Sequence, residues 1–151
     1  MEATRLMNRQ YLLDTNVWID IERGVANVKQ KLHTLSRTQI FLSPITVAEY
    51  RLGMLKYRSA EAPSQAWTGH NFGDFTDFEK RMSSFPLLEI GGETVEYYAR
   101  VRAYLESRGT PIGANDLWIA AQALENSVTL VTHNVNEFQR VPNLLVEDWR
   151  V

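Results

Sequence analysis

The chain has 151 residues, 44% of them hydrophobic, which suits one compact domain with its own core. Its 16 basic and 18 acidic residues give a net charge of −2, so overall charge neither indicates nor excludes a nucleic-acid partner. The absence of cysteine excludes disulfides, thiolate nucleophiles and zinc–sulfur sites. Because the sequence shows no long apolar run or export signal, we expect a soluble, cytoplasmic protein. Residues 1–151 are expected to form a single domain, with residues 1–9 as an N-terminal extension.

The first part of the chain alternates strand and helix signals. Residues 10–13 end in an apolar run that passes directly into Asp-Thr-Asn at residues 14–16, all good helix-capping residues. Because the apolar-rich residues 17–21 follow, the sequence predicts a strand that leads directly into a short helix. A second helix is predicted over residues 25–37, where apolar residues recur at helical spacing.

The middle of the chain continues the same alternation. Residues 40–42 are predicted to form a short buried strand, and a serine cap followed by a first-turn proline begins a helix over residues 44–58. Residues 59–73 contain proline and glycine and are the best loop candidate. Apolar residues at helical spacing then predict a helix over residues 75–85.

The last part of the chain completes an α/β pattern. The predicted elements are a strand at 87–90, an amphipathic helix at 95–105 that ends near Gly109, an apolar helix at 113–126, a strand at 128–131, a helical turn around Glu137 and a strand at 144–146. Strands separated by helices indicate a parallel sheet that is covered on both faces. In such a sheet, functional residues gather at the carboxyl ends of the strands.

Three acidic residues stand in segments that the pattern predicts to be buried. Asp14 follows the first strand, Asp116 opens the apolar helix DLWIAAQAL, and Glu49 borders a helical stripe that we expect to face the core. The stripe consists of Ile45, Ala48, Leu52 and Leu55. Since an unpaired buried carboxylate is costly, three together indicate a shared divalent cation.

Each carboxylate also has an ordinary explanation. Asp14 can act as a helix cap, and Asp116 as a first-turn acid that the helix dipole favours. Glu49 can extend to solvent from the edge of its stripe. The argument for a site therefore depends on the three residues occurring together.

Four segments in this order resemble a PIN-domain ribonuclease of the VapC type, the toxin of a bacterial toxin–antitoxin pair. They are LLDTN, SPITVAEYRLG, PIGANDLWIAA and LVTHNVNEF, within a match from Tyr11 to Trp149. The resemblance implies a three-layer α/β/α fold with a short parallel sheet of four to five strands. It also implies an endoribonuclease that depends on Mg²⁺ or Mn²⁺, a homodimer and a cognate VapB-like antitoxin. The catalytic and metal-binding acids would be Asp14, Glu49 and Asp116.

The resemblance assigns further residues to the site. Thr15 and Asn16 match a polar pair that orients the first aspartate or a metal-bound water, and Thr132 matches a hydroxyl residue beside the site. The family's fourth acidic position falls on Asn134, which offers an acceptor oxygen without charge. We therefore expect one well-bound metal, with Asn134 as a weak ligand and a second metal recruited with RNA. Glu137 is expected to face the same way if its segment is helical.

The chemistry expected of such a site follows from its charge. Clustered carboxylates repel one another, so one of them should have a raised pKa without metal. Oxygen ligands suit Mg²⁺ or Mn²⁺ better than Zn²⁺. A bound ion would activate a water molecule and neutralise charge on the scissile phosphate. We expect the antitoxin groove between the Glu49 helix and the helix of residues 93–108, and we expect His133 to face solvent.

Two other functions remain open from the sequence. One is a phosphotransfer enzyme of the haloacid-dehalogenase kind, because LLDTN ends a strand as that family's nucleophile does. Asn16 stands, however, where that family usually has a second aspartate. The other is a non-catalytic RNA- or protein-binding module on the same PIN fold, which the neutral Asn134 favours.

Overall fold

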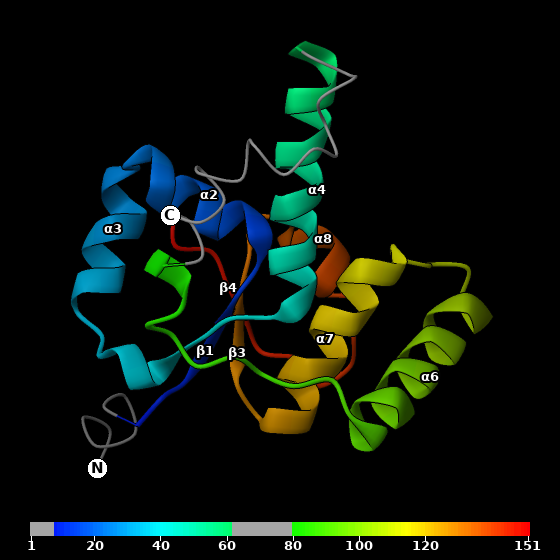
Figure 1. Ribbon diagram of the computed structural model, residues 1–151. Helices are drawn as coiled ribbons and strands as arrows, with labels where there is room; N and C mark the ends of the chain where they lie inside the picture. Colours follow the sequence, from blue (N-terminus) through cyan, green and yellow to red (C-terminus); the bar gives the residue numbers. More distant parts are fainter. Residues whose placement is uncertain (1–7, 62–79) are drawn as a thin grey trace.

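The computed structural model describes residues 8–61 and 80–151 and contains a parallel sheet of four strands (Figure 1). In spatial order the strands are β2 (Ile40–Phe41), β1 (Tyr11–Leu13), β3 (Thr129–Val131) and β4 (Val146–Glu147). The two central strands, β1 and β3, are buried along their whole length. This burial explains their continuous apolar sequences, since a parallel sheet is covered on both faces.

Helices cover both faces of the sheet (Figure 1). They are α2 (Thr15–Arg23), α3 (Ala26–His33), α4 (Pro44–Glu61), α6 (Gly92–Ser107), α7 (Ala114–Asn126) and α8 (Val135–Phe138). A short 3₁₀ turn spans Arg37–Gln39, and residues 80–82 are helical. Within the described ranges, no helix has the length and apolar character needed to cross a membrane.

Alternation along β1 divides the core into two clusters. Tyr11 and Leu13 pack on one face of the sheet with Trp18 of α2. Leu12 points to the other face and packs with a cluster that includes Leu105 of α6 and Ile119 of α7. Because successive side chains of a strand point to opposite faces, one strand contributes to both clusters. The predicted three-layer α/β/α fold with a short parallel sheet of four to five strands is confirmed, and the described residues form four strands of it.

The junction from β1 to α2 forms as its capping residues predict. Asp14 is the N-cap, and its carboxylate accepts a hydrogen bond from the backbone N–H of Thr15 at 2.8 Å. Gly24 ends α2 with a φ of 75°, a left-handed conformation that glycine adopts without strain. At the start of α4, the Ser43 hydroxyl accepts from the backbone N–H of Ile45 at 3.1 Å.

The prediction of a strand over residues 87–90 is wrong. The described chain forms a single parallel bridge there, between Leu42 and Leu87. The backbone N–H of Leu42 donates to Pro86, and that of Leu88 donates to the Leu42 carbonyl. Since α4 begins at Pro44, the extended segment after β2 is too short to pair with more residues.

Two other boundaries differ from the sequence predictions. The last strand, β4, begins at Val146 instead of residue 144, where Val146 comes opposite Leu130. Helix α4 continues to Glu61, so residues 59–61 are helical and do not belong to a loop. The rest of the predicted loop, and the predicted helix as far as residue 79, lie outside the described residues.

The buried side-chain amide of Gln122 connects three segments of the chain. The Gln122 side chain of α7 is fully buried. Its Oε1 accepts from the Ser43 hydroxyl at 2.5 Å, and its Nε2 donates to the Leu88 carbonyl at 2.8 Å. These bonds join α7 to the start of α4 and to the segment that follows residue 86, so Gln122 holds in place the two helices that carry Asp116 and Glu49.

We expect Gln122→Leu to lower the free energy of unfolding by about 2–3 kcal/mol, because the buried Ser43 hydroxyl and Leu88 carbonyl lose their partner. Urea denaturation would measure the change. Glu96→Gln is the control, since it removes an exposed ion pair with Arg100 within one helix and should cost less than about 0.5 kcal/mol. Equal losses in the two variants would contradict this role of Gln122.

Candidate active site

Asp14 lies where the two central strands end, and its position is closely fixed. Its backbone N–H donates to the Val131 carbonyl at 2.9 Å, which continues the β1–β3 pairing. The carboxylate is 5% exposed, and its second oxygen accepts from the Thr132 hydroxyl at 2.9 Å. Burial raises the pKa of Asp14, and the hydrogen bonds from Thr132 and Thr15 oppose this increase. Asp14 is therefore both the α2 cap and a buried acid held by its neighbours.

Glu49 reaches the same place from α4. The Thr15 hydroxyl donates to Glu49 Oε1 at 2.9 Å and also lies 3.3 Å from the Thr46 hydroxyl. Burial raises the pKa of Glu49, and the negative charge of Asp14 adds to the increase. Thr15 thus links the end of β1 to α4. Its hydroxyl holds Glu49, whereas the role predicted for Thr15 was to orient Asp14 or a metal-bound water.

The predicted core-facing stripe of α4 is partly wrong. Ala48 is exposed, and Leu52 is 53% exposed. Thr46 is fully buried, and Val47 and Tyr50 pack against the core. Figure 1 shows that α4 extends beyond the sheet, so helical spacing alone does not determine which of its residues meet the core.

Asp116 lies half-buried in the first turn of α7. Burial is the main cause that raises its pKa, to about 7, followed by the negative charges of Asp14, Glu137 and Glu49. A hydrogen bond with the Glu137 side chain also favours the neutral form of Asp116. Four carboxylates therefore share one electrostatic environment.

Asn134 and Glu137 stand together at the start of α8. The Asn134 side chain donates to Glu137 Oε2 at 2.8 Å, and the Asn134 backbone N–H donates to the Thr132 hydroxyl at 3.0 Å. Helix α8 places Glu137 against Asp116, so this segment brings a carboxylate to the cluster. Asn16, by contrast, is exposed on α2.

The donor set suits a hard divalent cation. Its acids offer only oxygen atoms, which Mg²⁺ and Mn²⁺ prefer, and a cation would relieve the repulsion that keeps Asp116 protonated near neutral pH. Within residues 8–61 and 80–151, no three acidic or histidine side chains are close enough to hold one ion by themselves. The arrangement therefore fits an ion such as Mg²⁺, which commonly takes one or two carboxylates and retains several waters.

The sequence interpretation missed two residues near the site and misplaced another. His133 does not face solvent: its side chain is 12% exposed and lies between Asp20 and Asp148. Asp20 is 2% exposed, and Thr46 is fully buried beside Thr15. A lone acid within the apolar run of residues 17–21 was the signal that could have identified Asp20.

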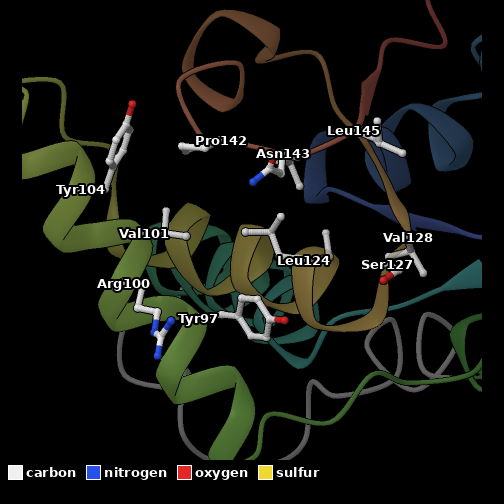
Figure 2. A pocket seen from close by; sticks show the side chains of 12 residues that line it. Tyr97, Arg100, Val101, Tyr104, Leu124, Ser127, Val128, Pro142, Asn143 and Leu145 are labelled. Atoms are coloured by element: carbon white, nitrogen blue, oxygen red, sulfur yellow. The ribbon is translucent and has the colours of Figure 1, made fainter.

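The groove predicted between α4 and the helix of residues 93–108 stays a prediction, and the described residues form other grooves. One groove lies between α2 and α4 and reaches Thr15 and Glu49. A second depression lies between α6, α7 and residues 142–145, with Tyr97 and Tyr104 at its side (Figure 2). Neither includes residues of both α4 and α6, and the first opens directly on the acidic site.

The raised pKa of Asp116 makes stability depend on pH in the metal-free protein. The unfolded chain releases the Asp116 proton near pH 4, whereas the folded protein retains it to about pH 7, so stability falls as pH rises through this range. We expect Asp116→Asn to raise the free energy of unfolding at pH 8 by about 1–2 kcal/mol, a value reduced for solvent screening of a half-exposed group. The gain should be small at pH 4.5. Urea denaturation with chelator at several pH values would measure it, and a gain independent of pH would contradict the assignment.

Comparison with known proteins identifies the family to which the chain belongs. The PIN domain model matches residues 11–144. Ribonuclease VapC2 of Rickettsia felis is 33% identical over 141 residues, covering 92% of this chain and 97% of that protein. The tRNA(fMet)-specific endonuclease VapC of Salmonella typhimurium is 28% identical over 141 residues, with coverage of 93% and 98%.

Solved structures give the same result. The complex VapBC2 from Rickettsia felis, bound to a DNA fragment from its promoter, has a chain that matches with a TM-score of 0.75 and 30% identity, covering 92% of this chain and 98% of that chain. VapBC-1 from nontypeable Haemophilus influenzae matches with a TM-score of 0.75 and 29% identity, covering 93% and 98%. The chain therefore belongs to the PIN-domain family, in its group of VapC ribonucleases.

Proposed function

We propose that the chain is the toxin of a VapBC-type pair and hydrolyses RNA phosphodiester bonds with the help of Mg²⁺ or Mn²⁺. The observation that carries the proposal is the convergence of Asp14, Glu49, Asp116 and Glu137, where burial and then the charges of the other three acids raise the pKa of Asp116 to about 7. Gathering ionised acids in this way at the carboxyl ends of parallel strands costs free energy unless a cation balances their charge. The names of the similar ribonucleases supply RNA as the substrate class.

In the proposed mechanism, Asp14 and Asp116 would hold the cation, and Glu49 would contribute from α4. A bound Mg²⁺ or Mn²⁺ supplies an activated water and offsets charge on the scissile phosphate. The Thr132 hydroxyl keeps one Asp14 oxygen in place, and the Thr15 hydroxyl does the same for Glu49. Asp116, whose pKa is about 7 without metal, would be held in its ionised form by a bound cation. Asn134 lies beside Glu137 without adding charge, which suits one well-held cation and a second that arrives with RNA.

We expect Asp14→Asn and Asp116→Asn each to lower RNA cleavage by at least about 100-fold, because each removes a charged ligand of the cation. Cleavage of structured RNA, with Mn²⁺ titrated from zero, would measure the loss. Chelator should abolish activity of the unchanged protein, and added Mn²⁺ should restore it.

Glu96→Gln is the matched control, since it makes the same change of acid to amide on the exposed face of α6. It should cleave at the unchanged rate. Full activity of Asp116→Asn would overturn the site assignment. Failure of the unchanged protein to cleave RNA at any metal concentration would favour the binding-module alternative, and phosphorylation of Asp14 would favour the haloacid-dehalogenase alternative.

The groove between α2 and α4 is our proposed docking place for a VapB-like antitoxin. Its lining includes Ile19, Tyr50 and Met54, and it ends at Thr15 and Glu49. An occupant of this groove would therefore cover the acidic site. Two of the similar structures are complexes of a toxin of this type with its antitoxin, which supports such a partner.

Gly53 offers a direct test of the groove. A Cβ at this position would meet no atom within 4 Å, so Gly53→Leu adds a side chain to the groove without an internal clash. We expect Gly53→Leu to weaken binding of the cognate VapB-like antitoxin by about 10-fold or more, since the added side chain takes the space of the partner. Calorimetric titration would measure the affinity. Unchanged affinity would contradict the proposed docking place.

A further inference from the structure

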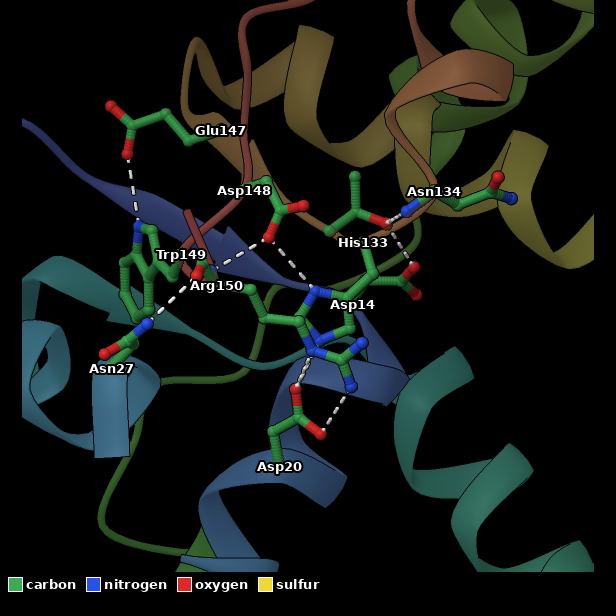
Figure 3. A network of polar contacts seen from close by, with 10 residues as sticks. Asp14, Asp20, Asn27, His133, Asn134, Glu147, Asp148, Trp149 and Arg150 are labelled. Carbon is green, nitrogen blue, oxygen red and sulfur yellow. Dashed lines mark hydrogen bonds and ion pairs between the residues drawn. The ribbon is translucent and has the colours of Figure 1, made fainter. Parts of the chain in front are cut away.

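A network of charged side chains holds His133 behind the acidic site (Figure 3). We call it the His133 anchor; its members are His133, Asp20, Asp148 and Arg150. Asp20 belongs to α2, His133 follows β3, and the other two follow β4. Three segments that are far apart in the sequence therefore meet at one imidazole ring.

Asp20 is the centre of the anchor. Its carboxylate is 2% exposed and accepts two hydrogen bonds from Arg150, at 2.8 and 2.9 Å. His133 Nε2 lies 2.5 Å from the same carboxylate, and His133 Nδ1 lies 3.2 Å from Asp148. Bonds to charged groups are stronger than neutral ones, and a two-point arginine contact also fixes orientation. The ring of His133 is therefore held on two sides.

The backbone of His133 connects this anchor to the site. The preceding residue is Thr132, whose hydroxyl donates to Asp14 Oδ2 at 2.9 Å. The following residue is Asn134, whose N–H donates to the Thr132 hydroxyl and whose side chain donates to Glu137. Residues 132–134 thus connect the His133 ring to Asp14 through Thr132 and to Glu137 through Asn134.

We propose that His133 is a positioning residue for RNA cleavage, which acts by fixing residues 132–134 so that Thr132 and Asn134 hold Asp14 and Glu137. This inference rests on the proposed nuclease function and assigns to Asp20 and Arg150 the task of holding the His133 ring. Partners of this kind orient the groups that bind a metal, and their loss commonly costs about 10- to 100-fold in activity or metal affinity.

The first experiment replaces His133 by Leu, which keeps an apolar side chain of moderate size but removes both contacts. We expect kcat to fall about 10- to 100-fold with little change in KM for RNA, because the ring is held by Asp20 and Asp148 and its loss alters the placement of the site acids. The Mn²⁺ concentration that half-saturates the protein should rise in the same variant. Titration of Mn²⁺ followed by electron paramagnetic resonance, without RNA, measures this second effect independently of activity.

Two variants separate positioning from stability. His133→Gln retains one donor for Asp20 and should recover part of the kcat. Arg81→Leu removes another two-point contact to α2, the one that Arg81 makes with Glu22 at 2.7 and 2.8 Å. It should leave kcat and Mn²⁺ binding unchanged even if it lowers the unfolding temperature. An equal loss of kcat in Arg81→Leu would mean that any weakening of α2 suffices, which would overturn the proposal.

A double-mutant cycle tests the route through Thr132. Thr132→Val removes the hydroxyl bond to Asp14. If His133 acts in part through Thr132, the double variant His133→Leu and Thr132→Val should lose less activity than the product of the two single losses. Multiplied losses would overturn the proposal. Should His133→Leu fail to fold, Asp20→Asn replaces it in the cycle, since this change keeps the shape of the carboxylate and weakens its hold on the ring.

The outcome also distinguishes this inference from the nuclease proposal. If the unchanged protein does not cleave RNA with Mn²⁺, the nuclease function fails, and Mn²⁺ binding still reports on His133. If the unchanged protein cleaves and Asp116→Asn does not, the function stands. Equal kcat and equal Mn²⁺ binding in His133→Leu would then overturn the role of His133 alone.

Discussion

The gathering of partly buried carboxylates is the constraint around which this structure is organised. Asp14, Glu49, Asp116 and Glu137 come from four elements, and burial together with the charges of the other three acids raises the pKa of Asp116 to about 7. Such an arrangement opposes folding, because each charge loses water and gains like-charged neighbours. The rest of the fold must supply both the free energy and the rigidity that keep these groups together.

The fold supplies that rigidity by giving the acids two kinds of support. Asp14 is continuous with the central strands and is held by the Thr132 hydroxyl, so its place depends on the sheet. Glu49 lies on α4 and Asp116 lies on α7. The buried Gln122 side chain of α7 accepts a hydrogen bond from Ser43 at the start of α4 and so connects the two helices. Since this bridge is fully buried and fully hydrogen-bonded, it fixes the helices without leaving a polar group unpaired. The core thus determines where the charges meet.

Local signals predicted much of this from the sequence, and long-range contacts account for what they missed. The strand before Asp14 and the cap at its end follow from neighbouring residues, and so does the apolar helix that begins near Asp116. The core face of α4 could not be assigned in the same way, because the exposure of Leu52 depends on how far the helix projects beyond the sheet. The pairing of Asp20 with His133 joins residues 113 positions apart, and no local pattern encodes it.

The neutral Asn134 illustrates how such contacts change the interpretation of a motif. By its position in the motif, Asn134 removes a charge from the acidic set. The structure brings Glu137 to Asp116 from one helical turn further on, and the Asn134 side chain donates a hydrogen bond to that carboxylate. The fourth negative charge is therefore carried by Glu137, three residues after the motif position, and Asn134 at that position orients the Glu137 carboxylate. Four acids therefore meet at the site, and a bound cation would balance their charge.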